Sequence, residues 1–556
     1  MNASDRPTRR PRILIVSPEI AALPASMDMT EREIAAKAGG LADATALLVA
    51  ALEEMGADVH VALPNYHRLF GHEPYQLPQR ELRRYHERPE DCRVHLAEDR
   101  AFYYQNRVYS PNDDLALHRS LVFQREVIHH IVPRVRPDLI HCNDWTTSLI
   151  PAMARRRGIK SLFTLHNIHS HDVTLERIES TGLDAAEFWT QLYFAHPPGC
   201  YEQTRGTVPV QLLASAIFAA DHVNTVSPGF LREIVDGWHD CVPPSARTEI
   251  RSKHASGHAS GILNAPDPSY HPSADRALAR PFTAADPLAG KAANKLALQQ
   301  ELGLHVDPDA AVFFWPSRLD PVQKGPELLT GILHRTVSDH WSRPLQLVVV
   351  ADGPHQQWFH QIVRQFSLQS RVAIRNFDER LARLAYAGSD FTLMPSRFEP
   401  CGLPQMIAPR YGSLPVVHAT GGLRDTVRHL DAQASTGNGF RFEVYDENGL
   451  RWAIEQAMLF HSRPQDVRER EIRRVMEQAH RDFDADGFTR QYIALYESLL
   501  DRPLLGEGAV KLPLPLPAAS PAIVKPHRSK APVTPLPLVH GLTHPSGHHH
   551  PSTALA

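Results

Sequence analysis

Short apolar segments of strand length alternate with amphipathic helical stretches along most of this chain, and that alternation limits the possible folds more than any other feature. Strands that alternate with helices form parallel sheets covered by helices on both faces. The first half is therefore predicted to be a doubly wound α/β domain. It has expected strands at 13–16, 58–63, 138–143, 161–166 and 222–227, and expected helices at about 43–55 and 210–220.

The same alternation begins again after a loop rich in proline, serine and alanine at 265–290. A helix is expected at 291–302, followed by strands at 312–316, 345–352, 371–376, 391–395 and 414–418. Because 556 residues are too many for one compact core, we predict two Rossmann-like doubly wound domains, at 12–275 and 276–485. Ligands of such sheets bind outside the carboxyl ends of the strands, so the two domains are expected to face a central cleft that holds the site.

Composition narrows the possible partners. A formal net charge of −3 gives no whole-chain attraction to nucleic acid or to an anionic membrane. The apolar stretch at 345–351 is too short to span a membrane. Five scattered cysteines without metal-ligand spacing favour a reduced, cytoplasmic protein and no metal site. The segment 502–556 is rich in proline and histidine, so we predict that it is a disordered tail without chemistry.

The first candidate site lies between the first strand and the first helix, in the sequence Lys37-Ala38-Gly39-Gly40. Paired glycines allow a ligand close to the backbone, and the helix start offers free N–H groups and the positive end of a dipole. With the charge of Lys37, these features suit a diphosphate. The alternative is a glycine turn that only begins a helix.

Two further candidates follow expected strands of the second half. Arg318 and Lys324 come after the strand at 312–316, where two cations could neutralise a departing phosphate. Solvated surface charges are the alternative. Glu399 comes after the strand at 391–395, where a carboxylate before a helix start could bind sugar hydroxyls or could simply favour the helix dipole. Thr420-Gly421-Gly422 opens the next helix and repeats the pattern of a phosphate-binding turn.

Two polar residues of the first half also follow strands. Asp144 comes after the strand at 138–143, and His166 ends the strand at 161–166. Both are therefore expected at the carboxyl edge of the first sheet, facing the predicted cleft. A histidine there could be a structural hydrogen-bonding group or part of an active site.

These motifs together resemble the family of bacterial glycogen synthases and plant starch synthases. The resemblance extends over about residues 12–500 and follows the family order. The matching motifs are Lys37-Ala38-Gly39-Gly40-Leu41-Ala42-Asp43, Asn143-Asp144-Trp145, Thr164-Leu165-His166-Asn167, Thr225-Val226-Ser227-Pro228-Gly229, Ser317-Arg318-Leu319, Gln323-Lys324-Gly325, Glu399-Pro400-Cys401-Gly402-Leu403 and Thr420-Gly421-Gly422-Leu423.

The resemblance implies a retaining glycosyltransferase of the GT-B type whose last helix, 486–501, returns to the first domain. The reaction it implies moves glucose from ADP-glucose to the non-reducing end of an α-1,4-glucan such as glycogen, without metal or cofactor. The implied donor-binding residues are Lys37, Gly39, Gly40, Cys401, Gly402, Leu403, Thr420, Gly421 and Gly422. The implied catalytic residues are Arg318 and Lys324 at the leaving diphosphate, Glu399 at the glucose hydroxyls, His166 near the 6-hydroxyl and Asp144 near the reacting face.

The chain departs from the family pattern mainly around the acceptor and the entry loop. The stretch between Glu19 and Lys37 is longer, one extra residue separates Arg318 from Lys324, and Thr146 stands where histidine is common. Ile168-His169-Ser170 also follows Asn167 in place of the family run. Two alternatives therefore stay open: a GT-B transferase that uses UDP-glucose, and a catalytically silent glucan-binding relative.

Overall fold

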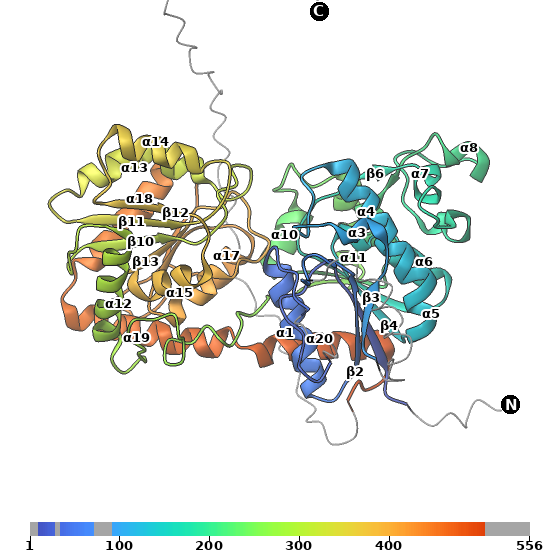
Figure 1. The fold of residues 1–556 in the computed structure, drawn as a ribbon, viewed down its shortest axis with the longest axis horizontal. Helices are drawn as coiled ribbons and strands as arrows, with labels where there is room; N and C mark the ends of the chain where they lie inside the picture. Colours follow the sequence, from blue (N-terminus) through green and yellow to red (C-terminus); the bar gives the residue numbers. More distant parts are fainter. Residues whose placement is uncertain (1–8, 28–33, 72–91, 506–556) are drawn as a thin grey trace, which may run out of the picture. The chain divides into compact units, whose positions relative to one another are not determined.

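A computed structural model describes residues 9–27, 34–71 and 92–505 of the chain (Figure 1). The first half builds a seven-stranded parallel sheet with the order β3-β2-β1-β4-β5-β8-β9. Its strands are β1 (Arg12–Val16), β2 (Asp58–Pro64), β3 (Val94–Ala97), β4 (Leu139–Asn143), β5 (Lys160–Leu165), β8 (His222–Thr225) and β9 (Ala259–Gly261).

Helices cover this first sheet, and strands such as β4 are therefore buried along their whole length. A two-stranded antiparallel pair, β6 (Asp172–Val173) with β7 (Val210–Gln211), stands apart from the main sheet. The α-helices are α1 (Gly40–Glu54), α3 (Arg100–Tyr103), α4 (Asp113–Glu126), α5 (Val132–Val135), α6 (Ile150–Arg156), α7 (Leu175–Glu179), α8 (Tyr201–Arg205), α9 (Leu212–Ala219), α10 (Pro228–Asp236) and α11 (Pro244–Ala255). Short turns of other helix types are η2 (Val127–Ile131), η3 (Trp145–Thr147), η4 (Ala185–Glu187) and η5 (Trp189–Gln191).

The second half builds a six-stranded parallel sheet with the order β12-β11-β10-β13-β14-β15. Its strands are β10 (Ala311–Trp315), β11 (Leu345–Val350), β12 (Val372–Arg375), β13 (Phe391–Met394), β14 (Leu414–His418) and β15 (Phe440–Phe442). Its helices are α12 (Pro287–Leu302), α13 (Pro326–Asp339), α14 (Gln356–Gln365), α15 (Glu379–Gly388), α16 (Pro404–Arg410), α17 (Gly421–Thr426), α18 (Glu447–His461) and α19 (Gln465–Asp482).

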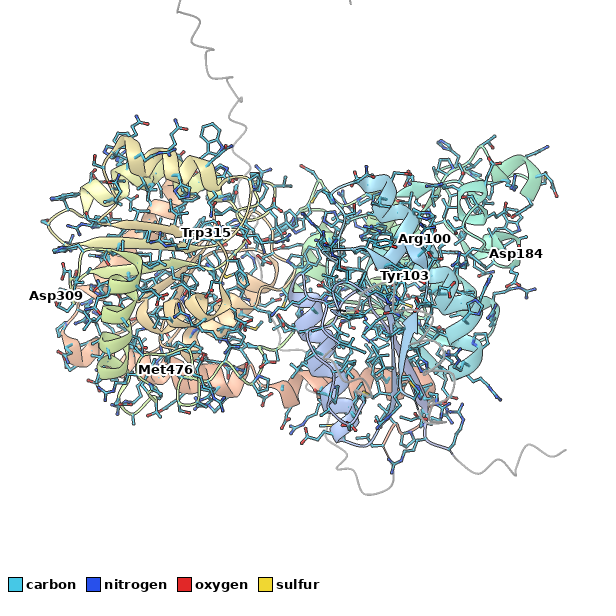
Figure 2. All side chains as sticks on the ribbon, viewed as in Figure 1. Arg100, Tyr103, Asp184, Asp309, Trp315 and Met476 are labelled. Carbon is cyan, nitrogen blue, oxygen red and sulfur yellow. The ribbon has the colours of Figure 1, made fainter. Side chains whose placement is uncertain are left out.

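The side chains of β10 explain why helices cover both faces of the second sheet. Phe313 and Trp315 pack in the core shared with α13, α14 and α18. Phe314, between them, packs in the core shared with α12, α15 and α19, to which Met476 belongs. Figure 1 shows these two groups of helices on opposite sides of the sheet, and Figure 2 labels Trp315 and Met476. Successive strand residues point to opposite faces, so an unbroken apolar strand requires two apolar layers.

The last helix, α20 (Ala485–Leu500), packs in the core of the first sheet. The Tyr496 hydroxyl lies 2.7 Å from Nδ1 of His141 in β4, and Asn224 Nδ2 donates to the Tyr492 hydroxyl at 3.0 Å. These contacts bury two tyrosines of α20 against the first sheet.

The chain beyond α20 differs at its start from the predicted tail. Arg502 forms an ion pair with Asp138 at 2.7 Å, and the side chain of Leu504 is fully buried. The remainder of the predicted tail, 506–556, lies outside the described residues. Among the helices that the structure describes, none is long and apolar enough to cross a membrane.

The predicted α/β class with two parallel doubly wound sheets is confirmed. Most expected strands appear within about two residues of their predicted limits. Three short edge strands, β3, β9 and β15, were not predicted, because three or four residues carry too little periodicity to be recognised. The exact domain limits stay a prediction.

Candidate active site

Lys324 and Glu399 form the centre of the candidate site in the second domain. They lie 75 residues apart in the chain, but β10 and β13 are neighbours, so the loops that follow these strands meet. Lys324 Nζ lies 2.6 Å from Glu399 Oε2, and the Ser396 hydroxyl donates to the same oxygen at 3.0 Å. The two charged side chains are 13% and 5% exposed. The arrangement places one cation and one carboxylate side by side in a nearly buried position.

The loop from Glu399 to Leu403 rests on the turn Thr420-Gly421-Gly422 at the start of α17. Gly421 has a φ of +43°, and a Cβ atom on it would overlap the carbonyl oxygen of Glu399. A Cβ atom on Gly422 would overlap the carbonyl of Cys401, and the Gly422 N–H donates to Glu399 O at 3.0 Å. The paired glycines therefore allow the loop that carries Glu399 to pack directly on this turn.

A carboxylate of the first domain binds this same turn. Glu233 of α10 accepts hydrogen bonds from the Gly421 N–H at 2.7 Å and from the Thr420 hydroxyl at 3.0 Å. His239 Nε2 lies 2.8 Å from Oε2 of Glu233, the oxygen that also accepts from Thr420. Nearby, Asp425 of α17 accepts from the Gly229 N–H at 2.6 Å. The turn that the sequence suggested as a phosphate site thus joins the two domains in this structure.

Asp144 and His166 lie together at the carboxyl edge of the first sheet. Asp144 has a φ of +59°, and its Oδ1 accepts from the N–H groups of His166 at 2.8 Å and of Asn167 at 3.0 Å. Burial raises the pKa of Asp144 to about 7. A left-handed conformation in a residue other than glycine is costly and is held here by these bonds.

His166 is a neutral imidazole with a defined tautomer. Burial lowers the pKa of its ring to about 3. Its Nε2 lies 3.0 Å from Oδ1 of Asn143, whose Nδ2 donates to the carbonyl of Val16 at 3.2 Å. Oδ1 of Asn143 is an amide oxygen and can only accept a hydrogen bond. Nε2 of His166 therefore carries the proton, and Nδ1 keeps its lone pair.

The loop of Lys37 begins α1. Lys37 Nζ pairs with Asp43 at 2.8 Å, and its side chain is 42% exposed. A Cβ atom on Gly40 would lie 3.4 Å from Leu403, so this loop of the first domain borders the Glu399 loop of the second. The N–H groups of Ala38 and Gly39 donate to Glu19, at 2.6 and 3.1 Å.

Arg318 is exposed after β10. Burial is the main cause that lowers the pKa of His169, and the charges of His171 and Arg318 add to it. The loop after β10 is therefore within electrostatic range of the loop after β5.

The predicted residues thus fall into groups that are in contact. Lys324, Glu399 and the loop 401–403 lie on the turn 420–422, Gly40 borders Leu403, and Asp144 holds His166. Sequence reasoning missed Glu19 and Glu233 as parts of the site. Glu19 stands after the first strand and could have been noted as a buried acid, whereas Glu233 gives no signal inside an ordinary amphipathic helix.

Two parallel Rossmann-like sheets, with the loops at their carboxyl ends in contact, are the architecture of GT-B glycosyltransferases. The structure of the catalytic domain of starch synthase IV from Arabidopsis thaliana, bound to ADP and acarbose, matches with a TM-score of 0.71 and 27% identity. The match covers 89% of this chain and all of that one. Residues 12–241 match the model for the starch synthase catalytic domain, and residues 303–474 match that for glycosyl transferases group 1.

The chain belongs to the glycogen synthase and starch synthase family. Glycogen synthase from Bacillus subtilis (strain 168) is 32% identical over 495 residues, which cover 83% of this chain and 95% of that protein. Glycogen synthase 2 from Geobacter sulfurreducens is 34% identical over 511 residues, which cover 85% and 98%. Membership of this family makes the chain a glucosyltransferase enzyme.

Proposed function

We propose that this enzyme transfers glucose from ADP-glucose to the non-reducing end of an α-1,4-glucan, with retention of configuration at the anomeric carbon. The observation that carries the proposal is the nearly buried pair of Lys324 and Glu399, in a chain that is homologous to glycogen synthases along most of its length. The ADP and acarbose bound to the Arabidopsis relative support an adenine nucleotide donor and an oligosaccharide acceptor.

In the proposed reaction, the bond between glucose C1 and the diphosphate oxygen breaks, and negative charge grows on that oxygen. Lys324 and the exposed Arg318 would supply the counter-charge, since preorganised cations stabilise such a charge without reorganisation. The acceptor 4-hydroxyl would attack C1 from the face that the diphosphate leaves, and its proton would pass to the departing phosphate oxygen. Attack from that face retains the configuration.

Glu399 has a different task in this proposal. Its Oε2 is bonded to Lys324 and Ser396, which leaves Oε1 for hydroxyl groups of the donor glucose. The backbone of Cys401, Gly402 and Leu403 would bind the same sugar. Packing of this loop on Gly421 and Gly422 would hold it in place, which is the positioning contribution to catalysis.

The first domain would supply the remaining groups. His166 would contact the sugar near its 6-hydroxyl, where its neutral Nδ1 can accept a hydrogen bond. Asp144 would lie near the reacting face and fix the backbone of His166. Lys37 and the N–H group of Gly40 would bind the diphosphate, with Gly39 shaping the turn between them and Thr420 completing the donor site. The proposal requires no metal or cofactor.

We also place the enzyme in the cytoplasm, in accord with an acceptor stored inside cells and with five cysteines that are all free thiols. Reducing compartments keep thiols in this state.

The test is nucleoside diphosphate release by the purified protein, with ADP-glucose or UDP-glucose and with or without glycogen. Release that needs both ADP-glucose and glycogen, with longer glucan chains as product, is the expected result. Release with UDP-glucose but not with ADP-glucose would identify UDP-glucose as the donor. Glycogen binding without any release by folded protein would reverse the proposal in favour of a silent glucan-binding relative.

A further inference from the structure

Glu19 is a buried carboxylate that binds the loop of Lys37, and no role was predicted for it. It follows β1 and is 2% exposed. Its Oε2 accepts from the N–H groups of Ala38 and Gly39, at 2.6 and 3.1 Å. Its Oε1 accepts from the hydroxyl of Tyr109 at 3.1 Å. Three groups from two distant parts of the chain therefore converge on one side chain.

Glu19 also stands at the base of the long entry loop. Ile20 and Ala36 exchange two backbone hydrogen bonds, of 3.0 and 2.9 Å, which bring the two ends of the loop together. The hydrogen bonds that Ala38 and Gly39 donate to Glu19 hold the same two segments together one step further along the chain. The position of Lys37, between the two sets of bonds, is therefore fixed at its backbone on both sides.

These bonds decide which backbone groups remain for a ligand. The N–H groups of Ala38 and Gly39 point to Glu19, so they are not directed at the donor side. Gly40 and Leu41 form the first turn of α1, where N–H groups have no acceptor within the helix. Gly40 is also the residue that borders Leu403 of the second domain.

We infer that Glu19 is a positioning residue for the donor: it holds the Lys37 loop so that the lysine and the N–H groups of Gly40 and Leu41 face the diphosphate. The inference deepens the proposed function and rests on it. Glu19 itself does not touch the diphosphate.

A fully charged Glu19 this close to the loop would repel an anionic donor. Burial raises the pKa of Glu19 to about 7, and the charge of Asp144 adds to the effect of burial. A carboxyl group that is protonated for part of the time still accepts the two N–H bonds through Oε2. The repulsion is therefore smaller than that of an ordinary glutamate.

The test compares Glu19→Ala, Glu19→Gln and Tyr109→Phe with the unaltered enzyme, in steady-state assays with varied donor and with varied glycogen. Glu19→Ala is expected to raise the KM for the donor between about 10- and 100-fold, as for a displaced binding group. The KM for glycogen should stay unchanged. Glu19→Gln keeps an accepting oxygen and should recover the donor KM to within about threefold. Tyr109→Phe leaves both loop bonds in place and should have the smallest effect.

Calorimetric titration with ADP measures the same loss without turnover, and thermal unfolding identifies a variant that has not folded. An unchanged donor KM and ADP affinity in folded Glu19→Ala would overturn the inference. So would an equal loss in the donor and glycogen constants, which indicates general damage. If Glu19→Ala does not fold, a folded Glu19→Gln variant that has lost its ADP binding would overturn the inference as well. Failure of the proposed function is a separate result, since the unaltered enzyme would then release no nucleotide.

Discussion

The pair of Lys324 and Glu399 should behave differently in stability and in activity when both residues are replaced. Lys324→Met leaves a buried carboxylate with Ser396 as its remaining partner, and Glu399→Gln leaves a buried ammonium without its counter-charge. Removing one partner of a buried ion pair costs about 3–5 kcal/mol, whereas replacing both by neutral groups is often close to neutral. Each single variant should therefore unfold at a lower temperature, and the double variant should recover most of the loss.

Activity should show no such recovery. Each residue is proposed to act on a different part of the donor, so each single variant should lose at least about 100-fold in kcat. The double variant should be at least as inactive as the poorer single variant, because restored folding does not replace a missing charge. Nucleotide release with saturating donor and glycogen measures kcat, and calorimetric or fluorescence melting measures stability on the same samples.

An exposed ion pair provides the matched control. Arg380 and Glu301 also connect two segments of the second domain, but their side chains are 56% and 37% exposed. Exposed pairs contribute about 0–1 kcal/mol, so Arg380→Met should change neither melting nor activity appreciably. Two results would refute the reasoning. One is a double variant whose loss of stability equals the sum of the single losses, and the other is a double variant that regains activity.

Three further experiments test other contacts. Gly421→Ala should abolish most activity by displacing the loop above it, while Gly303→Ala, at a φ of +70° with open space, should cost only about 1 kcal/mol of stability and no activity. Equal activity losses would show that backbone strain, not the overlap, is responsible. Tyr496→Phe should destabilise by about 1–3 kcal/mol, because Nδ1 of His141 loses its buried partner; an unchanged melting temperature would contradict this. Glu19 holds its proton more tightly when folded than when unfolded, so its contribution to stability should fall as pH rises from about 4.5 to 7. Between these pH values the free energy of unfolding of the unaltered enzyme should therefore change by up to about 3 kcal/mol more than that of Glu19→Gln, as measured by melting.

The fold could be predicted largely because the strands are buried on both faces. In β10, five consecutive apolar residues leave no polar face, and such a strand needs helices on both sides. The order of the strands could not be predicted in the same way. The sequence places Lys324 and Glu399 far apart, and only the crossover that sets β13 beside β10 brings them within hydrogen-bonding distance.

Candidate site residues with full charges are easier to predict from the sequence than the residues that contact them. Lys37, Arg318 and Glu399 follow strands, where the α/β rule expects ligands to bind. Glu233 could not be found, because it sits on an amphipathic helix of one domain and its acceptor role depends on a turn of the other. A contact between domains has no periodic signature in either segment.

The two glycine turns show why a glycine pair alone does not identify a phosphate site. At Gly421 and Gly422 the missing side chains make room for the carbonyl groups of another loop, and the Gly421 N–H is bound by Glu233. At Gly39 the N–H is bound by Glu19, and only the neighbouring Gly40 borders the opposite domain. In both turns a carboxylate of the first domain occupies a group that the sequence would assign to phosphate. A glycine pair therefore needs a second indication of a phosphate site, such as a cationic side chain, and Lys37 supplies one beside Gly39 and Gly40.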